Sequence, residues 1–423
     1  MGPATPDVAG LRLREEDRMR TVVVGAGVVG VTTAYALARK GHTVTVIERQ
    51  PSTAMESSFA NGGQLSFGFA SPMASPDILK KAPSILLGQD RAFTLPWRFL
   101  LREPAWLLRF TRACLPSAYQ RHAKALSELA AASKDALDRL CDETGARFSR
   151  RQSGKLTIYD SVQALDRIAA QLPNVSAATV LDRDACLALD PALAHIAGQL
   201  AGGVWFEQDE IGDVERFCHQ VAKQCTQLFG TQFRFNLNVD TAQCKTGDGL
   251  TLRLSDGSSM DCDAMVICTG SAGQRLLKHH HIQLPIVPVV GYSITAPLGM
   301  EPPQVAITDA RHKVVCSRIG DYIRIAGFAD FGPPDEATRR DRIDALLHLA
   351  RQRFPAAADF YHLHSTWTGI RPATPSSLPI VGATNVPGVY LNMGHGMYGW
   401  TLAPATAERL ATAIQPPAHR NAA

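Results

Sequence analysis

The stretch that most constrains the fold is TVVVGAGVVGVTTAYALARKGHTVTVIE, residues 21–48. Two short apolar runs, 21–24 and 44–47, flank a glycine-rich turn and a helical pattern, and the second run ends on Glu48. The order strand, glycine turn, helix, strand and acid is typical of a βαβ unit that binds a dinucleotide. We therefore predict a Rossmann-like parallel sheet that begins with this unit.

The glycines of the turn have separate expected tasks. Gly25 allows the tight turn, Gly27 lets a pyrophosphate approach the backbone, and Gly30 lets the helix pack closely on the strand. Glu48 is expected to bind the ribose hydroxyls, and because its carboxylate repels a 2′-phosphate, NADP is disfavoured while FAD and NAD both remain open. The predicted cofactor contacts here, including helix-start amides that face the pyrophosphate, are Gly25, Ala26, Gly27, Val28, Val29, Gly30 and Glu48.

Composition excludes several classes of protein. With 423 residues, 45% hydrophobic and 19% charged, the chain is long enough for two globular domains, and its net charge of +4 is too small to imply nucleic acid. Nine cysteines without metal-ligand spacing predict reduced thiols, a cytoplasmic setting and no metal site. No apolar run reaches the roughly 18–20 residues that span a membrane. The tails 1–19 and 416–423 are predicted to be disordered, without a secretion signal.

Basic and apolar residues concentrate in the segment 77–125. Within 80–124, nine Lys and Arg residues stand against Asp90 and Glu103, a local charge of +7. Prolines divide the segment into pieces, which predicts short amphipathic helices. Two interpretations are open: a peripheral contact with the inner face of the plasma membrane, or an internal helical cover over the active site with a solvated basic face.

The remaining chain alternates between two kinds of pattern. The loop 57–72 is rich in glycine and polar donors, which suits a close approach to a ligand. Strand-like runs at 286–296, 304–308, 313–317 and 321–327 predict a second, antiparallel sheet. Further strands are expected at 233–239 and 263–268, a helix capped by Asp213 at 214–228, and a last helix at 401–414.

Four stretches occur in the order expected of FAD-dependent amine oxidoreductases of the D-amino-acid oxidase superfamily: VVVGAGVVG…VIE, ESSFANGGQLSFG, VICTG and TGIRPATPSSLPIVG…YLNMGHGMYGWTLAP. Together with PVVGYSIT and FEQDEIGD, they resemble the bacterial D-amino-acid dehydrogenase (small subunit) group over about residues 20–415. Two features depart from that group. LAPAT at 402–406 is closer to glycine oxidase, and His312 stands where the group tends to carry Tyr, which leaves the preferred substrate side chain open.

The resemblance implies an α/β fold with an α+β substrate domain, in which a Rossmann-like FAD-binding domain is interleaved with an antiparallel-sheet substrate domain. The expected FAD-binding parts are 20–76, 201–285 and 366–415, the segment 126–200 is mixed and mostly substrate domain, and 286–365 forms the substrate sheet.

The resemblance also implies roles for individual residues. Arg371 would hold the substrate carboxylate by a bidentate pair, and Tyr292 and His312 would face the substrate. The helix start near Gly394 would lie under the flavin ring, where its partial positive charge stabilises the reduced form. The implied FAD contacts beyond the glycine turn are Arg49, Ser57, Ser58, Ala60, Asn61, Gly62, Gly63, Gln64, Leu65, Val239, Thr269, Gly270, Gly369, Arg371, Gly394, His395, Gly396, Met397, Tyr398, Gly399, Trp400 and Thr401.

The implied reaction is oxidative deamination of a D-amino acid to a 2-oxo acid and ammonia, by hydride transfer from the α carbon to FAD. A quinone or another acceptor would then take the electrons. Because SSFANGG contains no His and no Cys lies near Arg371, the FAD is expected to be non-covalent. An alternative with the same chemistry is an O₂-using oxidase of glycine, sarcosine or D-proline-type substrates. Arg371 and the C-terminal glycine motif argue against a third class, a non-catalytic flavoprotein or NAD-binding regulatory subunit.

Overall fold

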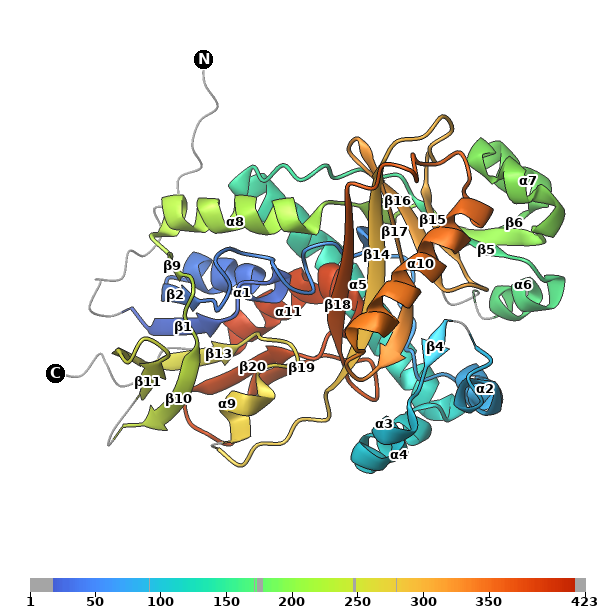
Figure 1. Cartoon of the computed structure of the whole chain (residues 1–423). Coiled ribbons are helices and arrows are strands. Elements are labelled where there is room, and N and C mark those ends of the chain that lie inside the picture. The colour runs from blue at the N-terminus through green and yellow to red at the C-terminus, as the bar shows by residue number, and fades with distance from the viewer. Residues whose placement is uncertain are drawn as a thin grey trace, which may run out of the picture.

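The computed structural model describes residues 18–90, 92–170, 172, 178–245, 249–278 and 280–414, organised around two large sheets that lie beside each other (Figure 1). The predicted disordered tails lie outside these ranges, apart from Arg18 and Met19.

The first sheet has six strands in the order β19-β20-β13-β1-β2-β9. Every pair in it is parallel except β19 with β20. This arrangement confirms the predicted Rossmann-like sheet, to which the chain returns from distant segments. The strands are β1 (Arg20–Val24), β2 (Thr43–Ile47), β9 (Gln232–Arg234), β13 (Ala264–Ile267), β19 (Ile380–Ala383) and β20 (Val389–Met393).

Both faces of this sheet are covered, which explains why its strands are almost continuously apolar. Val23 and Val46 pack towards helices, whereas Val22 and Val24 pack towards the small sheet β10-β11-β12. The small sheet consists of β10 (Val239–Cys244), β11 (Leu250–Leu254) and β12 (Ser259–Cys262), and the nearby helices are α1 (Val28–Arg39), α5 (Pro116–Thr144), α8 (Val214–Phe229), α9 (Gln274–Lys278) and α11 (Gly399–Ala413). As predicted, the Asp213 carboxylate caps α8 by accepting a hydrogen bond from the Arg216 amide.

The second sheet has nine strands, with the path β18-β14-β17-β16-β15-β5-β7-β6 and β4 paired to β17. Most pairs are antiparallel, as predicted, but β15 with β5 and β4 with β17 are parallel. Helix α10 lies across one face in Figure 1. The strands are β4 (Phe93–Thr94), β5 (Lys155–Tyr159), β6 (Ala178–Asp182), β7 (Gly202–Phe206), β14 (Val287–Pro297), β15 (Ala306–Asp309), β16 (Val314–Ile319), β17 (Tyr322–Phe331) and β18 (Ser365–Ala373).

The smaller elements complete the second half. A two-stranded sheet joins β3 (Gln64–Leu65) to β8 (Glu210–Ile211), and the 3-10 helix η4 (Gly396–Tyr398) precedes α11. The helices around the large sheet are α6 (Val162–Ala169), α7 (Arg183–Leu189), η3 (Pro191–Gln199) and α10 (Glu336–Arg353).

Three predicted boundaries differ from the structure. The strand expected at 233–239 is divided into β9 and β10, because Asn236 adopts a left-handed backbone with φ of 58°, a conformation that Asn tolerates in turns. Strand β7 pairs with β5 and β6, and β18 pairs with β14, so both belong to the large sheet rather than to the FAD-binding parts assigned from the sequence. The sheet to which a strand belongs depends on pairing with strands that are distant in the sequence, which local patterns do not show.

The segment 77–125 forms α2 (Pro76–Leu86), α3 (Trp97–Arg102), α4 (Pro104–Ala113) and the start of α5, below the large sheet in Figure 1. Phe99 and Trp106 are buried and pack with Val287, Val289 and Phe331 of the sheet. The segment is therefore in part an internal cover. No helix within the described residues combines the length and apolarity needed to cross a membrane.

Candidate active site

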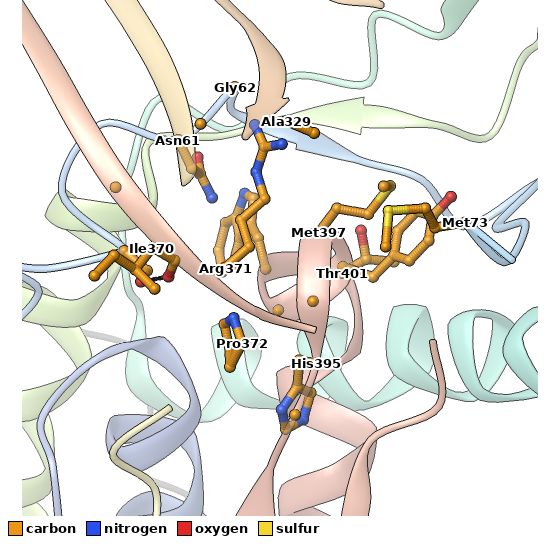
Figure 2. A pocket seen from close by; sticks show the side chains of 18 of the residues that line it. Asn61, Gly62, Met73, Ala329, Ile370, Arg371, Pro372, His395, Met397 and Thr401 are labelled. Atoms are coloured by element: carbon orange, nitrogen blue, oxygen red, sulfur yellow. Dashed lines mark hydrogen bonds between the residues drawn. The ribbon is translucent and has the colours of Figure 1, made fainter. Parts of the chain in front are cut away.

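A single cavity of about 2640 Å³ runs between the two large sheets. Its lining extends from Glu48 and Val239 of the nucleotide-binding half, past the loop 57–64, to Arg371 and the start of α11. Figure 2 shows Arg371 crossing the middle of this space, with His395 on one side of it. The cavity brings together segments from both ends of the sequence.

The glycine turn at the first end is shaped as the sequence predicts. Gly25 has φ of 102°, which only glycine adopts readily. A Cβ on Gly30 would lie 1.8 Å from the Gly25 carbonyl oxygen, so a side chain there would force α1 away from the strand. The Glu48 carboxylate accepts hydrogen bonds from the amides of Ala26 (2.6 Å) and Gln50 (2.8 Å), which fixes it beside the turn.

The loop 57–65 crosses from the glycine turn to the large sheet. The Ser58 hydroxyl accepts a hydrogen bond from the Val28 amide at 3.1 Å, which holds the loop against the first turn of α1. A Cβ on Gly62 would lie 2.6 Å from a methyl group of Val315, so glycine permits the close approach to β16. The Gln64 side chain then bonds to the β15 backbone at Ile307 (3.2 Å).

The start of α11 forms the third wall. Gly394 and Gly396 have φ of 79° and 55°, which turn the chain from β20 into η4 and α11. The Thr401 hydroxyl accepts a hydrogen bond from the Ser66 amide at 3.1 Å and so ties this helix start to the loop. His395 is buried beside Thr406, and burial lowers its pKa to about 3, so it is neutral at physiological pH.

Arg371 extends from β18 into the cavity. Its Nη1 donates to the Phe328 carbonyl at 2.9 Å, and it forms no ion pair within the described part of the chain. Burial lowers the pKa of the guanidinium. Gly291 of β14 makes room for it, because a Cβ there would lie 2.3 Å from Arg371 Nη2. A cavity-lining guanidinium without a protein carboxylate can bind the carboxylate of a ligand.

Tyr292 lines the same cavity, but its hydroxyl is already engaged. It donates to Asp330 Oδ2 at 2.7 Å, and the guanidinium of Arg342 binds both oxygens of that carboxylate (2.9 and 2.7 Å). Burial, followed by the hydrogen bond to Asp330, raises the pKa of Tyr292. The phenol is therefore protonated at neutral pH, and its ring forms part of the wall.

Four predicted site residues lie outside the cavity lining as the structure describes it: Ala26, Gly30, Leu65 and His312. The Ala26 amide bonds to Glu48, and Gly30 packs against the Gly25 carbonyl, so both contribute to the glycine turn. Leu65 is fully buried in the core. The His312 ring instead bonds to Asp309 at 2.9 Å, and the same carboxylate binds buried Arg353. This ion-pair cluster holds His312 away from the position that the resemblance implied.

All other predicted site residues line the cavity, and several were missed. Gly291 lies in the strand predicted at 286–296, and Lys155 lies in β5. The residues that they contact come from distant strands and loops, so the local sequence pattern does not indicate their role. Ser66 lies within the predicted loop 57–72, directly after Leu65, the last FAD contact predicted there. Asn392 stands in the YLNMGHG motif and its amide oxygen has no hydrogen-bond partner among the described residues.

The residues present fit FAD. The volume of the cavity exceeds that of an ordinary small-molecule pocket, roughly 300–1,000 Å³. The cavity extends from the glycine turn to Arg371. Two lining residues, Thr269 and Asn392, carry buried polar oxygens without a partner among the described residues, as expected of groups that meet a polar ligand. The α1 N-terminus and Glu48 would hold the dinucleotide, and the α11 start would hold the flavin end.

Comparison with known proteins agrees with this geometry. Residues 20–413 match the family model described as FAD dependent oxidoreductase. A protein of Methylobacterium radiotolerans named D-amino acid dehydrogenase is 38% identical, covering 94% of this chain and 96% of that protein. One of the same name from Rhizobium johnstonii is 34% identical over 92% and 94%. Glycine oxidase of Bacillus cereus shares the fold, with a TM-score of 0.71 and 20% identity over 93% of this chain and 94% of that one. The chain belongs to the FAD-dependent oxidoreductase family and is an enzyme that uses FAD.

Proposed function

We propose that the enzyme deaminates D-amino acids oxidatively to 2-oxo acids and ammonia, as a dehydrogenase. The observation that carries the proposal is Arg371, a guanidinium that lines the cavity beside the start of α11 and forms no ion pair within the described residues. The names of the relatives support the substrate class.

The chain's own residues supply binding and orientation. Arg371 would bind the substrate carboxylate through two parallel hydrogen bonds, and Gly291 leaves the space that this position requires. Bound FAD supplies the chemistry of accepting a hydride from the α carbon. Because the Tyr292 hydroxyl donates to Asp330 and its pKa is raised, this tyrosine orients the substrate by packing and does not act as a base.

The test is incubation of the purified enzyme with D-amino acids and a soluble dye as acceptor. We expect one 2-oxo acid and one ammonia for each two-electron equivalent of dye reduced, and no such products from the L enantiomers. Turnover of L-amino acids alone would refute the proposal. Reoxidation by air as fast as by the dye would favour the oxidase alternative.

We also propose a quinone as the natural acceptor and a cytoplasmic enzyme in peripheral contact with the membrane. Helices α2 to α4 support the contact, because they expose a set of apolar side chains next to basic ones. Leu87, Trp97 and Leu101 are 73%, 65% and 72% exposed. The adjacent exposed cations are Arg98, Arg102, Arg109 and Arg112. Aromatic and apolar side chains enter the headgroup region, and anionic lipid attracts each nearby cation by about 1 kcal/mol.

A vesicle assay tests this contact. We expect the enzyme to pellet with anionic vesicles at low salt and much less at high salt, since the Debye length is about 10 Å at 0.1 M. The variant should replace Arg98, Arg102, Arg109 and Arg112 with Gln, because Lys80 and Lys81 line the cavity. This variant should lose pelleting and keep dye-linked activity. Wild type that stays in the supernatant at low salt would refute the contact.

A further inference from the structure

Part of the cavity lining belongs to strands and helices other than those that carry Arg371, and we call this part the second compartment. Its walls come from β5, β7, α5, α6 and the loop that follows β3. Its residues are Phe69, Tyr119, Lys155, Tyr159, Arg167 and Phe206, and all of them line the cavity.

The compartment is lined by aromatic side chains. The rings of Phe69 and Phe206 stack with centroids 5.7 Å apart and planes 9° apart. Phe69 and Tyr159 pack on the same small apolar cluster as Phe206. The hydroxyls of Tyr119 and Tyr159 form no hydrogen bond within the described part of the chain, and burial raises the pKa of Tyr159 to about 12, so this phenol remains a proton donor. Such a wall suits a planar ring that carries hydrogen-bond acceptors.

Lys155 brings a buried positive charge to this wall. Its Nζ lies 2.6 Å from Asp209 Oδ2, 3.0 Å from Ser66 Oγ and 4.9 Å from the centre of the Phe206 ring. The other oxygen of Asp209 accepts a hydrogen bond from the Gly68 amide at 2.6 Å. Lys155 is part of the cavity lining and Asp209 is not, so the lysine is the member of the pair that borders the compartment. An ammonium group has three donors, and among the described residues Ser66 is the hydrogen-bond acceptor for this one, beside the ion pair with Asp209.

The compartment is separate from the proposed carboxylate site but close to the flavin end. Arg371 bonds to Phe328 of β17, and in the order β17-β16-β15-β5 the backbone of β5, which carries Lys155, lies three strand spacings, about 14 Å, from the backbone of β17. A small amino acid held by Arg371 does not reach that far. Ser66, which binds Lys155, also binds Thr401 in the first turn of α11.

We propose that this second compartment binds the electron acceptor, a planar quinone. The aromatic rings would stack on the quinone ring, and Lys155 would donate a hydrogen bond to one carbonyl oxygen and stabilise the negative charge that develops on it during reduction. In the balanced step, the quinone takes two electrons and one proton from the reduced cofactor and one proton from water, and becomes a quinol. The proposal rests on the proposed function, which requires an acceptor, and adds its binding site.

The test uses holoenzyme variants at Lys155. Lys155→Met removes the ammonium, and Lys155→Met with Asp209→Asn removes both charges, so that no buried carboxylate is left unpaired. The control is Lys134→Met, because Lys134 also pairs with an acid, Glu210, and lies 6.0 Å from a Phe67 ring but is not part of the cavity lining. The probe is a water-soluble, short-chain ubiquinone.

Three quantities are measured: the KM for the quinone, the Kd of the oxidised holoenzyme for the quinone by calorimetry, and the rate of anaerobic flavin bleaching by a D-amino acid. Both Lys155 variants should raise the quinone KM and Kd at least tenfold, with bleaching within twofold of wild type, and the control should change none of them. An unchanged quinone KM and Kd in either Lys155 variant overturns the proposal, as does a parallel fall in bleaching. Failure of the proposed function gives a different result: no D-amino acid then bleaches the flavin of the wild type. That result overturns both the proposed function and the quinone site.

Discussion

A methyl group added at Gly291 should impair substrate binding by displacing Arg371, although no residue that contacts the substrate is itself replaced. Gly291 lies in β14 opposite Gly369 of β18, and its added Cβ would stand 2.3 Å from Arg371 Nη2 and 2.5 Å from Cζ. The guanidinium must move by about 1 Å to restore ordinary contact at 3.4 Å. A misplacement of that size can lower a rate about 10²-fold, which corresponds to about 2.7 kcal/mol.

The assay for Gly291→Ala is the steady-state kcat/KM for a D-amino acid with a soluble dye, together with the FAD content after dialysis. We expect kcat/KM to fall about 10²-fold while FAD is retained, because Gly291 lies at the substrate end of the cavity. Gly198→Ala is the matched control, since nothing lies within 4 Å of an added Cβ there. A kcat/KM for Gly291→Ala within threefold of the control would refute the reasoning.

Three further predictions concern the cofactor and the fold. Glu48→Ala should lose FAD on dialysis, since it removes the carboxylate that holds the glycine turn and that we expect to bind the ribose; full retention would contradict the ribose role. Acid precipitation should release all flavin into the supernatant, and colour in the pellet would contradict non-covalent binding. Burial lowers the pKa of His42 to about 4, so the folded state excludes a proton that the unfolded state binds, and stability falls as pH drops below 6.5. When the pH falls from 7 to 5, the unfolding free energy of wild type should therefore drop by about 2 kcal/mol more than that of His42→Asn, which has no imidazole to protonate. Denaturant titrations at both pH values measure the two drops, and equal drops would refute the burial argument.

Local patterns predict the nucleotide-binding half well. The glycine turn, the cap at Asp213 and the C-terminal glycines depend on backbone conformations that one residue type supplies, so they are visible in short stretches of sequence. Their predicted positions agree with the structure, with φ of 102° at Gly25 and 79° at Gly394.

The parts that sequence reasoning missed depend on partners far along the chain. His312 was expected at the substrate, but the cluster of Asp309 and Arg353 binds it elsewhere. Gly291 is needed because the Arg371 side chain passes close to it, and this contact is visible only in the structure. Lys155 is likewise placed by its contacts with Asp209 and Ser66, which are distant in sequence. Sheet order, which assigns β7 and β18 to the large sheet, is likewise set by tertiary pairing.

The most direct test of the central claim is the rate of anaerobic flavin bleaching with each enantiomer of one amino acid, in the wild type and in Arg371→Ala. The wild type should be bleached by the D enantiomer and not by the L enantiomer. Arg371→Ala should keep its FAD and bleach at least 10²-fold more slowly at low substrate, since loss of a partner for a buried carboxylate costs about 3–5 kcal/mol. Equal bleaching by both enantiomers, or an unchanged rate in Arg371→Ala, would contradict the account.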